Sequence, residues 1–445
     1  MKTQERIKSV LLCVLLLGAV YLTYAVWFFD SPIGSISLKS IFNIPSGAGL
    51  ASSGGDSDLE EYGIRPLAVL VRDDSGARGA SYEASESDRI YKTLRNEIKS
   101  AVSSAAALEQ VTEKVWLDEI VKNGVLLDWR GDVPFAVFSE WLGNGGLTSD
   151  ALMRYMFIST DRKNAKIFIK STDGKIFSAK TGLSSESLLN ALNGVSGRDA
   201  YLAGERSERD FEAAEPEMIC VDSRPRPQVI SSYNSCDMFM QSVTDGCLYV
   251  LGLSDVTPST YAEQNGTAVY VADMVTLKIN PAGEASYSDT RDEIDDTIGL
   301  GVKNISNKNT GPTLGEKADY ARSIASSAAS FLPGSGGIYL ASSKINGDNS
   351  EFVFCRHIGG IPIDSKDTGF FVRVVMRGKN VRTVRINLRC YDVGTQVADT
   401  MSERLAAAAL FGKGAKGGLT LRYRDTGDAL IMPAWFVSSD ETAKE

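Results

Sequence analysis

The chain has 445 residues, of which 43% are hydrophobic and 23% charged, a composition typical of globular domains. Its net charge of −9 argues against a nucleic-acid-binding protein, because such proteins carry a basic surface. Six cysteines in this length are too few for a disulfide-rich scaffold. At about 100 to 200 residues per domain, the length predicts about two to four domains.

The segment from Val10 to Phe29 contains no charge and no proline. At about 1.5 Å per helical residue it is long enough to cross the roughly 30 Å core of a bilayer. Lys2, Arg6 and Lys8 outnumber the acidic residues before it, which predicts a cytoplasmic tail over residues 1–9 and an extracytoplasmic remainder. We therefore expect a single-pass protein of the cell membrane. A cleaved signal peptide is the alternative, although its apolar core usually spans only about 7 to 15 residues.

Two small residues of this predicted helix, Ala19 and Thr23, are four positions apart and so lie on one face. Small residues at this spacing allow membrane helices to pack closely. We expect this face to contact a partner helix, with a plain anchor as the alternative.

Residues 30–63 are rich in serine, glycine and acidic residues, which predicts a flexible extracytoplasmic linker. Residues 64–196 are predicted to form an N-terminal α+β domain. It opens with a strand at 66–71 and a helix at about 85–107, whose buried stripe recurs every four residues at Ile90, Leu94, Ile98 and Val102. Further helices are predicted at 108–123, 134–142 and 184–192, and strands at 125–129, 154–159, 166–169 and 175–178.

Residues 197–311 are predicted to form a β-rich middle domain, with strands at 248–253, 268–279 and 285–287. Residues 312–445 are predicted to form a C-terminal α+β domain. Its elements are helices at 314–331 and 396–411, hairpins of 338–342 with 351–358 and of 370–377 with 381–391, and strands at 419–423 and 429–437. The predicted fold class is α+β, a multi-domain ectodomain of antiparallel sheets with helices packed on one face.

The residues needed for common catalytic sites are scarce in this sequence. His357 is its only histidine, so a zinc site of several imidazoles and a Ser-His-Asp triad lack their partners. We interpret His357 as a polar residue at a strand end. The acidic run 289–296 lacks the glycine and distal glutamate of a helix-loop-helix calcium site, which favours a solvated loop. Carboxylate pairs of the glycosidase kind are defined by spacing in space, so the sequence leaves them open.

The cysteines that follow the membrane segment match no zinc-binding pattern and leave one or two disulfides open: Cys220, Cys236, Cys247, Cys355 and Cys390. The sequence therefore predicts no metal site, no cofactor and no enzymatic activity.

Basic residues concentrate near the C-terminal end, where residues 352–424 hold thirteen Lys or Arg against five Asp or Glu. Side chains alternate along a strand, so Arg373 and Arg377 share one face, and Arg385 and Arg389 share one face of the next strand. We expect these four arginines to form one exposed patch. The patch is either a solvated sheet face or a docking surface for an acidic partner. That partner would be a protein ectodomain or an anionic wall polymer.

Several short motifs occur in a suggestive order. They are Ile-Lys-Ser-Val-Leu at 7–11, Leu-Thr-Tyr-Ala-Val-Trp at 22–27, Arg65-Pro66, Gly-Val-Leu-Leu-Asp-Trp-Arg-Gly-Asp-Val-Pro at 124–134, Leu-Lys-Ile-Asn-Pro-Ala-Gly at 277–283, Gly360-Ile361-Pro362-Ile363 and Met432-Pro433-Ala434-Trp435. This order resembles the YycH family, and the last unit resembles the related YycI. The resemblance implies a single-pass protein of Gram-positive cells that works with a YycI-like protein. Together they modulate the sensor histidine kinase WalK, also called YycG, in cell-wall signalling, and neither is an enzyme.

Two classes of function follow from these observations. The first is a membrane-anchored regulatory protein that acts through protein contacts. The alternative is a wall-polymer-binding module or a carboxylate-dependent cell-wall hydrolase, which the predicted extracytoplasmic address also allows.

Overall fold

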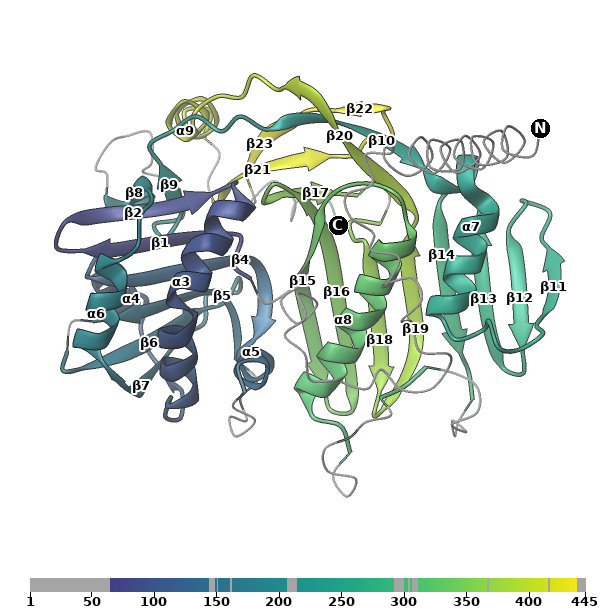
Figure 1. The fold of residues 1–445 in the computed structure, drawn as a ribbon, viewed down its shortest axis with the longest axis horizontal. Helices are drawn as coiled ribbons and strands as arrows, with labels where there is room; N and C mark the ends of the chain where they lie inside the picture. The colour runs from purple at the N-terminus through teal and green to yellow at the C-terminus, as the bar shows by residue number, and fades with distance from the viewer. Residues whose placement is uncertain are drawn as a thin grey trace, which may run out of the picture. The chain divides into compact units, whose positions relative to one another are not determined.

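The computed structural model describes residues 65–143, 149, 151–160, 162–205, 214–291, 300–302, 305, 311–365, 368–414 and 417–437. They all fall in one compact unit, Ser53–Glu445. The described chain is α+β, as predicted (Figure 1). The predicted tail, membrane helix and linker, with Ala19 and Thr23, lie outside the described residues. Among the helices that are described, none is long and apolar enough to span a bilayer.

The first of two large sheets has nine strands in the order β3-β7-β6-β5-β4-β1-β2-β8-β9. Its strands are β1 Ala68–Asp73, β2 Gly76–Ser81, β3 Glu109–Gln110, β4 Gly124–Pro134, β5 Leu152–Ser159, β6 Asn164–Lys170, β7 Ile176–Ser184, β8 Arg198–Leu202 and β9 Ile219–Val221. Its helices are α3 Ala84–Ser103, α4 Glu113–Ile120, α5 Phe135–Trp141 and α6 Ser185–Asn193.

Both faces of this first sheet are covered. Val69 and Val71 of β1 pack in the core that includes α3 and α6, whereas Ala68 and Leu70 pack in a second core with Trp116 of α4. The expectation of helices on one face is therefore wrong for this sheet. Strand β1 is apolar on both faces, so both faces must be buried against other elements. The predicted stripe of α3 is confirmed, since Ile90, Leu94, Ile98 and Val102 are all buried.

The second large sheet has eleven strands, in the order β11-β12-β13-β14-β19-β18-β16-β17-β21-β23 with β15 beside β16. They are β11 Ser259–Ala262, β12 Ala268–Ala272, β13 Val275–Asn280, β14 Glu284–Asp289, β15 Gly337–Asn346, β16 Asn349–Ile358, β17 Ile361–Asp364, β18 Val372–Arg377, β19 Asn380–Asn387, β21 Leu419–Arg424 and β23 Pro433–Val437. Neighbours pair antiparallel, apart from the parallel pair of β17 and β21.

Helices α7 (Ser235–Val250) and α8 (Leu314–Phe331) cover one face of this sheet (Figure 1). The predicted bounds of α8 are confirmed, and Thr313 begins the helix with a capping box to Glu316. The buried face of α8 is mostly alanine, at Ala318, Ala321, Ala325 and Ala328. Such small side chains allow the helix axis to lie close to the sheet. The second sheet therefore has its helices on one face.

A third, small sheet joins β20 (Arg389–Val397), β10 (Gln228–Asn234) and β22 (Leu430–Ile431). The helix α9 (Glu403–Phe411) packs in a core that also includes Cys220 of β9 and Ile361 of β17. That core therefore connects the first sheet with the C-terminal strands. The two large sheets also meet directly where β4 crosses β15, and a side chain at Gly131 would collide with the carbonyl oxygen of Ala341.

The predicted middle domain, residues 197–311, does not form a sheet of its own. Strands β8 and β9 extend the first sheet, β10 enters the small sheet, and β11 to β14 join the second sheet through the pairing of β14 with β19. The alternating buried residues Ala285 and Tyr287 of β14 lie opposite Ile386 and Val384 of β19, so the two strands continue one apolar face.

Several predicted elements were wrong, among them the strand at 268–279, which is the antiparallel hairpin of β12 and β13. The predicted strand at 248–253 is the end of α7, a helix that bends at the non-helical Phe239 and buries only a narrow face. The predicted helix at 396–411 begins later, because β20 runs to Val397 and Ser402 caps α9 with its side chain. The five described cysteines are all buried and free, so none of the disulfides left open by the sequence is present among them.

Candidate functional site

Three of the four predicted patch arginines share the face of the second sheet opposite α7 and α8, here called the arginine face. Arg373 of β18 lies directly opposite Arg385 of β19, and Arg377 lies four positions further along β18. Arg373 binds Glu351 at 2.8 Å, and Arg385 binds Glu284 at 2.6 Å. Their charges are therefore largely compensated at this face, and Arg377 is the exposed member of the group.

Arg389 is not part of that patch, and its prediction was wrong. It begins β20 in the small sheet, where its Nε lies 2.5 Å from Asp425 and its Nη2 donates to Ser232. The Asp425 side chain is fully buried and also accepts a hydrogen bond from Tyr391. The chain leaves the second sheet at Leu388, and alternation along the sequence does not reveal that change of sheet. A role of the other three arginines in partner binding stays a prediction.

His357 lies near the end of β16, as the sequence suggested. Its Nδ1 accepts a hydrogen bond from the backbone N–H of Gly360 at 3.2 Å. Burial lowers the pKa of His357 to about 4, so the ring is neutral at physiological pH. Of the acidic run, Asp289 is buried and paired with Arg291 rather than solvated, and residues 292–299 lie outside the described chain.

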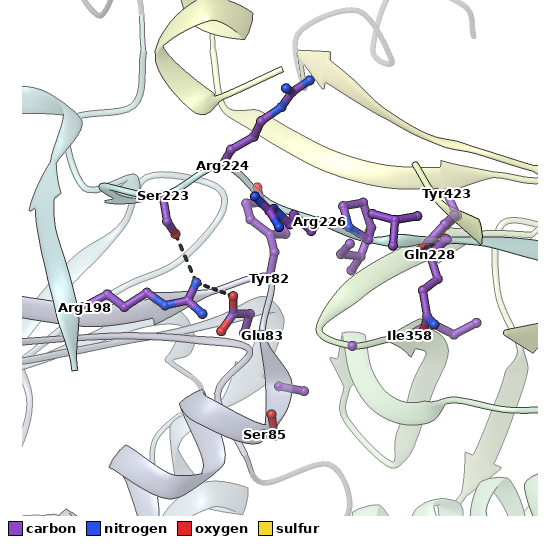
Figure 2. A pocket seen from close by; sticks show the side chains of 15 residues that line it. Tyr82, Glu83, Ser85, Arg198, Ser223, Arg224, Arg226, Gln228, Ile358 and Tyr423 are labelled. Carbon is purple, nitrogen blue, oxygen red and sulfur yellow. Dashed lines mark hydrogen bonds and ion pairs between the residues drawn. The ribbon is translucent and has the colours of Figure 1, made fainter. Parts of the chain in front are cut away.

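The structure reveals a cleft that the sequence did not predict (Figure 2). It has a volume of about 840 Å³, within the roughly 300 to 1,000 Å³ typical of ligand sites. Its walls come from the start of α3, from β8, from the segment before β10, from the turn between β16 and β17, and from β20 and β21. It thus lies where strands of all three sheets approach one another.

The cleft combines arginines with apolar side chains. Arg198 binds Glu83 at 2.5 Å and Ser223 at 3.1 Å, and Figure 2 shows its guanidinium turned toward both. Arg224 points away from this pair and binds Asp399 and the carbonyl oxygen of Thr400. The apolar part of the lining consists of Tyr82, Pro227, Ile358, Ile361, Val397 and Tyr423.

Arg226 differs from the other two arginines of the cleft. Its side chain is exposed, and no ion pair or hydrogen bond joins it to any described residue. The glutamate and aspartate near the cleft are engaged with Arg198 and Arg224. Among the described lining residues, Arg226 therefore supplies the uncompensated positive charge.

Tyr82 forms the connection between the cleft and the interior. Its hydroxyl accepts hydrogen bonds from Arg130 at 2.8 Å and from the backbone N–H of Leu421 at 3.1 Å. Trp435 of β23 packs edge-on against the Tyr82 ring, with centroids 5.5 Å apart. Burial raises the pKa of Tyr82, which keeps the hydroxyl protonated. One side chain of the first sheet is thus held by two C-terminal strands.

Both partners of this hydrogen bond are strained. Tyr82 and Arg130 have φ angles of 60° and 59°, in the left-handed region that residues other than glycine rarely adopt. Such conformations persist where surrounding contacts fix them, and they occur often at functional sites.

Behind Tyr82, buried charges form a compensated network. The guanidinium of Arg130 lies 3.1 Å from the carboxylate of Asp128, and Arg154 lies 3.6 Å from Asp128 and 3.2 Å from Glu215. Asp128 is almost fully buried, so its charge depends on these partners. The network fixes β4 against β5 and against the segment that leads into β9.

Glu403, the first residue of α9, is a buried carboxyl group beside this network. It accepts a hydrogen bond from the backbone N–H of Val221 at 2.9 Å. Burial raises its pKa to about 8, an effect that the hydrogen bond and the charge of Arg130 reduce only in part. The contact between β9 and α9 therefore contains a group that titrates near neutral pH.

In the sequence, Asp128 and Arg130 were noted only as part of the motif at 124–134. Tyr82 and Arg226 were not predicted to be site residues. The alternation Arg-Pro-Arg-Pro at residues 224–227 was the available signal for the cleft. Two prolines fix an extended backbone, so the arginine between them projects from a rigid segment. The strained backbone of Tyr82 has no such signature, because its hydrogen-bond partners Arg130 and Leu421 lie 48 and 339 residues away.

Comparison with known proteins gives one weak similarity in structure. The chain is similar to the crystal structure of YycH from Bacillus subtilis, with a TM-score of 0.47 and 11% sequence identity, over 85% of this chain and 94% of that chain. No protein-family model matches the chain, and no curated protein matches it. At this identity, no residue role transfers from one protein to the other.

Proposed function

We propose that this protein is a membrane-anchored extracytoplasmic regulator that modulates a sensor histidine kinase of the WalK type through protein contacts, together with a YycI-like protein. The proposal rests on the order of the short motifs and on where three of them lie. Its membrane anchor is the predicted helix from Val10 to Phe29.

The observation that carries the proposal is the convergence of two motifs on the Tyr82 side chain, with a third motif beside the backbone that follows it. Motif 124–134 supplies Arg130, which donates to the Tyr82 hydroxyl. Motif 432–435 supplies Trp435, which packs on the Tyr82 ring. Motif 360–363 follows Gly359, whose carbonyl oxygen accepts from the N–H of Ala84, two residues after Tyr82. Short motifs that matched by chance would be expected to lie scattered through the fold rather than to meet at one side chain.

The composition of the cleft favours binding over hydrolysis. A glycosidase of the usual kind needs two carboxyl groups about 5 to 10 Å apart at the bond that is cleaved. Glu83 is the carboxylate among the described lining residues, and it is engaged by Arg198. A non-enzymatic role is therefore the one we propose.

Copurification from membranes tests this function. Full-length tagged protein, solubilised in mild detergent, is expected to retain the kinase and the YycI-like protein, and its deletion is expected to change the phosphorylation of the kinase's response regulator. A second variant, in which an unrelated apolar helix replaces Val10 to Phe29, separates contacts within the bilayer from contacts of the ectodomain. A loss of association in that variant would point to the face of Ala19 and Thr23.

Two results would contradict the proposal. The first is the absence of both partners from the purified wild-type protein together with unchanged kinase signalling after deletion. The second is release of sugars or peptides from purified cell walls by the full-length protein, lost when one aspartate or glutamate is changed. That result would favour the hydrolase alternative.

A further inference from the structure

The segment that carries Arg226 is held rigidly at the wall of the cleft. The carbonyl oxygen of Pro227 accepts from the N–H of Ala398 at 2.7 Å, and the carbonyl oxygen of Gln228 accepts from the hydroxyl of Tyr423 at 2.7 Å. Pro225 and Pro227 fix the backbone on either side of the arginine. The backbone that carries this charge is therefore fixed before any ligand arrives, which reduces the entropy lost on binding.

The charges of the cleft point to a ligand with few negative groups. Arg198 and Arg224 are each engaged with a carboxylate, so the lining presents one uncompensated cation rather than a continuous basic surface. A polyanion such as a phosphate polymer binds best where many cations neutralise it together. The described lining does not offer such a row.

The apolar lining distinguishes the ligand further. Val397 is 54% exposed at this cleft, whereas Ile358, Pro227 and Tyr82 are almost fully buried in its wall. A phosphate polymer has no side chains that would bury this surface, whereas an extended peptide alternates side chains along its length. A carboxylate next to apolar side chains complements both parts of the lining.

We propose that the cleft binds an extended peptide segment of a partner protein, with a carboxylate that pairs with Arg226 and an apolar side chain that contacts Val397. The inference rests on the proposed function only for the identity of the partner. The cleft itself can be tested without any partner.

The test uses full-length protein in detergent and a fluorescent eight-residue peptide in which glutamate alternates with leucine, with binding followed by anisotropy. Arg226→Gln is expected to weaken binding about three- to fivefold, the effect of losing one partly exposed ion pair. Val397→Ser is expected to weaken it about twofold. The matched control is Lys180→Gln, which removes a positive charge from an exposed position of β7 outside the cleft and is expected to leave binding unchanged.

Three outcomes would overturn the inference. Equal binding by wild type and Arg226→Gln would exclude this arginine as the anchor. An equal loss in Lys180→Gln would show a general charge effect. Competition by a glycerol phosphate polymer as strong as that of unlabelled peptide, with no effect of Val397→Ser, would assign the cleft to a polyanion.

The two proposals can fail separately. If Arg226→Gln loses peptide binding but no kinase copurifies from membranes, the cleft is supported as a peptide site. The kinase is then excluded as the partner. Kinase copurification that persists while the wild-type protein fails to bind the peptide would overturn the peptide cleft and leave the regulator.

Discussion

The arginine face of the second sheet and the junction around Tyr82 both carry ion pairs, but in very different surroundings. On the sheet face, the side chains of Arg385 and Glu284 remain 42% and 28% exposed. In the small sheet beside the junction, Asp425 is fully buried against Arg389. Water screens the first pair, so it contributes little to stability, whereas loss of one partner in the second leaves an uncompensated buried charge. The same residue types thus have surface roles in one region and structural roles in the other.

The largest effect is expected from removing the buried carboxylate. Asp425→Ala leaves Arg389, Ser232 and Tyr391 without their common partner and should lower the free energy of unfolding by about 3 to 5 kcal/mol. Glu284→Ala removes a partner of the exposed pair and should cost at most about 1 kcal/mol. Denaturant titrations of both variants measure the difference, and similar losses would refute the contrast.

Glu403 makes the stability of the junction depend on pH. Its pKa is about 8 in the folded chain against an ordinary 4.5, so between these values the unfolded chain releases a proton that the folded chain keeps. The free energy of unfolding should therefore fall as pH rises through this window, by about 1.4 kcal/mol per pH unit. Glu403→Gln cannot ionise and should show a flatter profile in denaturation measured from pH 5 to pH 8. Parallel profiles would contradict the assignment.

A smaller loss is expected from Tyr82→Phe. The change leaves Arg130 and the backbone N–H of Leu421 without their shared acceptor, at a cost of about 1 to 3 kcal/mol. Tyr261→Phe is the matched control, because Tyr261 is exposed on the edge strand β11. It should stay within about 0.5 kcal/mol of wild type in thermal or chemical unfolding. Equal effects of the two changes would mean that the Tyr82 hydroxyl does not join the sheets.

The smallest effect is expected on the arginine face of the second sheet. Arg377→Gln should change the free energy of unfolding by no more than about 0.5 kcal/mol, because the residue is exposed at the end of β18. Its effect on association with an acidic partner, measured as the salt dependence of binding, would then report recognition alone. A large stability loss would show that this face is structural as well.

The sequence predicted best where burial follows a local period. The stripe of α3 was predicted from apolar residues four positions apart, the end of α8 from Pro333 and Gly334, and the hairpin of β15 and β16 from its Asn-Gly turn. It failed where distant segments decide the outcome. The helix α7 buries a narrow face interrupted by a bend, and Arg389 follows its strand into another sheet. For the candidate site, Asp128 and Arg130 were visible as a motif, but their partner Tyr82 was not.

The hydrogen bond between Tyr82 and Leu421 joins residues 339 positions apart, and this separation has a consequence for the order of events during synthesis. At about 5 to 20 residues per second, a ribosome needs roughly 17 to 70 seconds to add that length of chain. The helices that cover the first sheet, from α3 to α6, are made early in that interval. The first sheet can therefore fold before the C-terminal strands are synthesised, while Tyr82 still lacks its C-terminal partners. The cleft beside Tyr82 forms only after the last strands have been made.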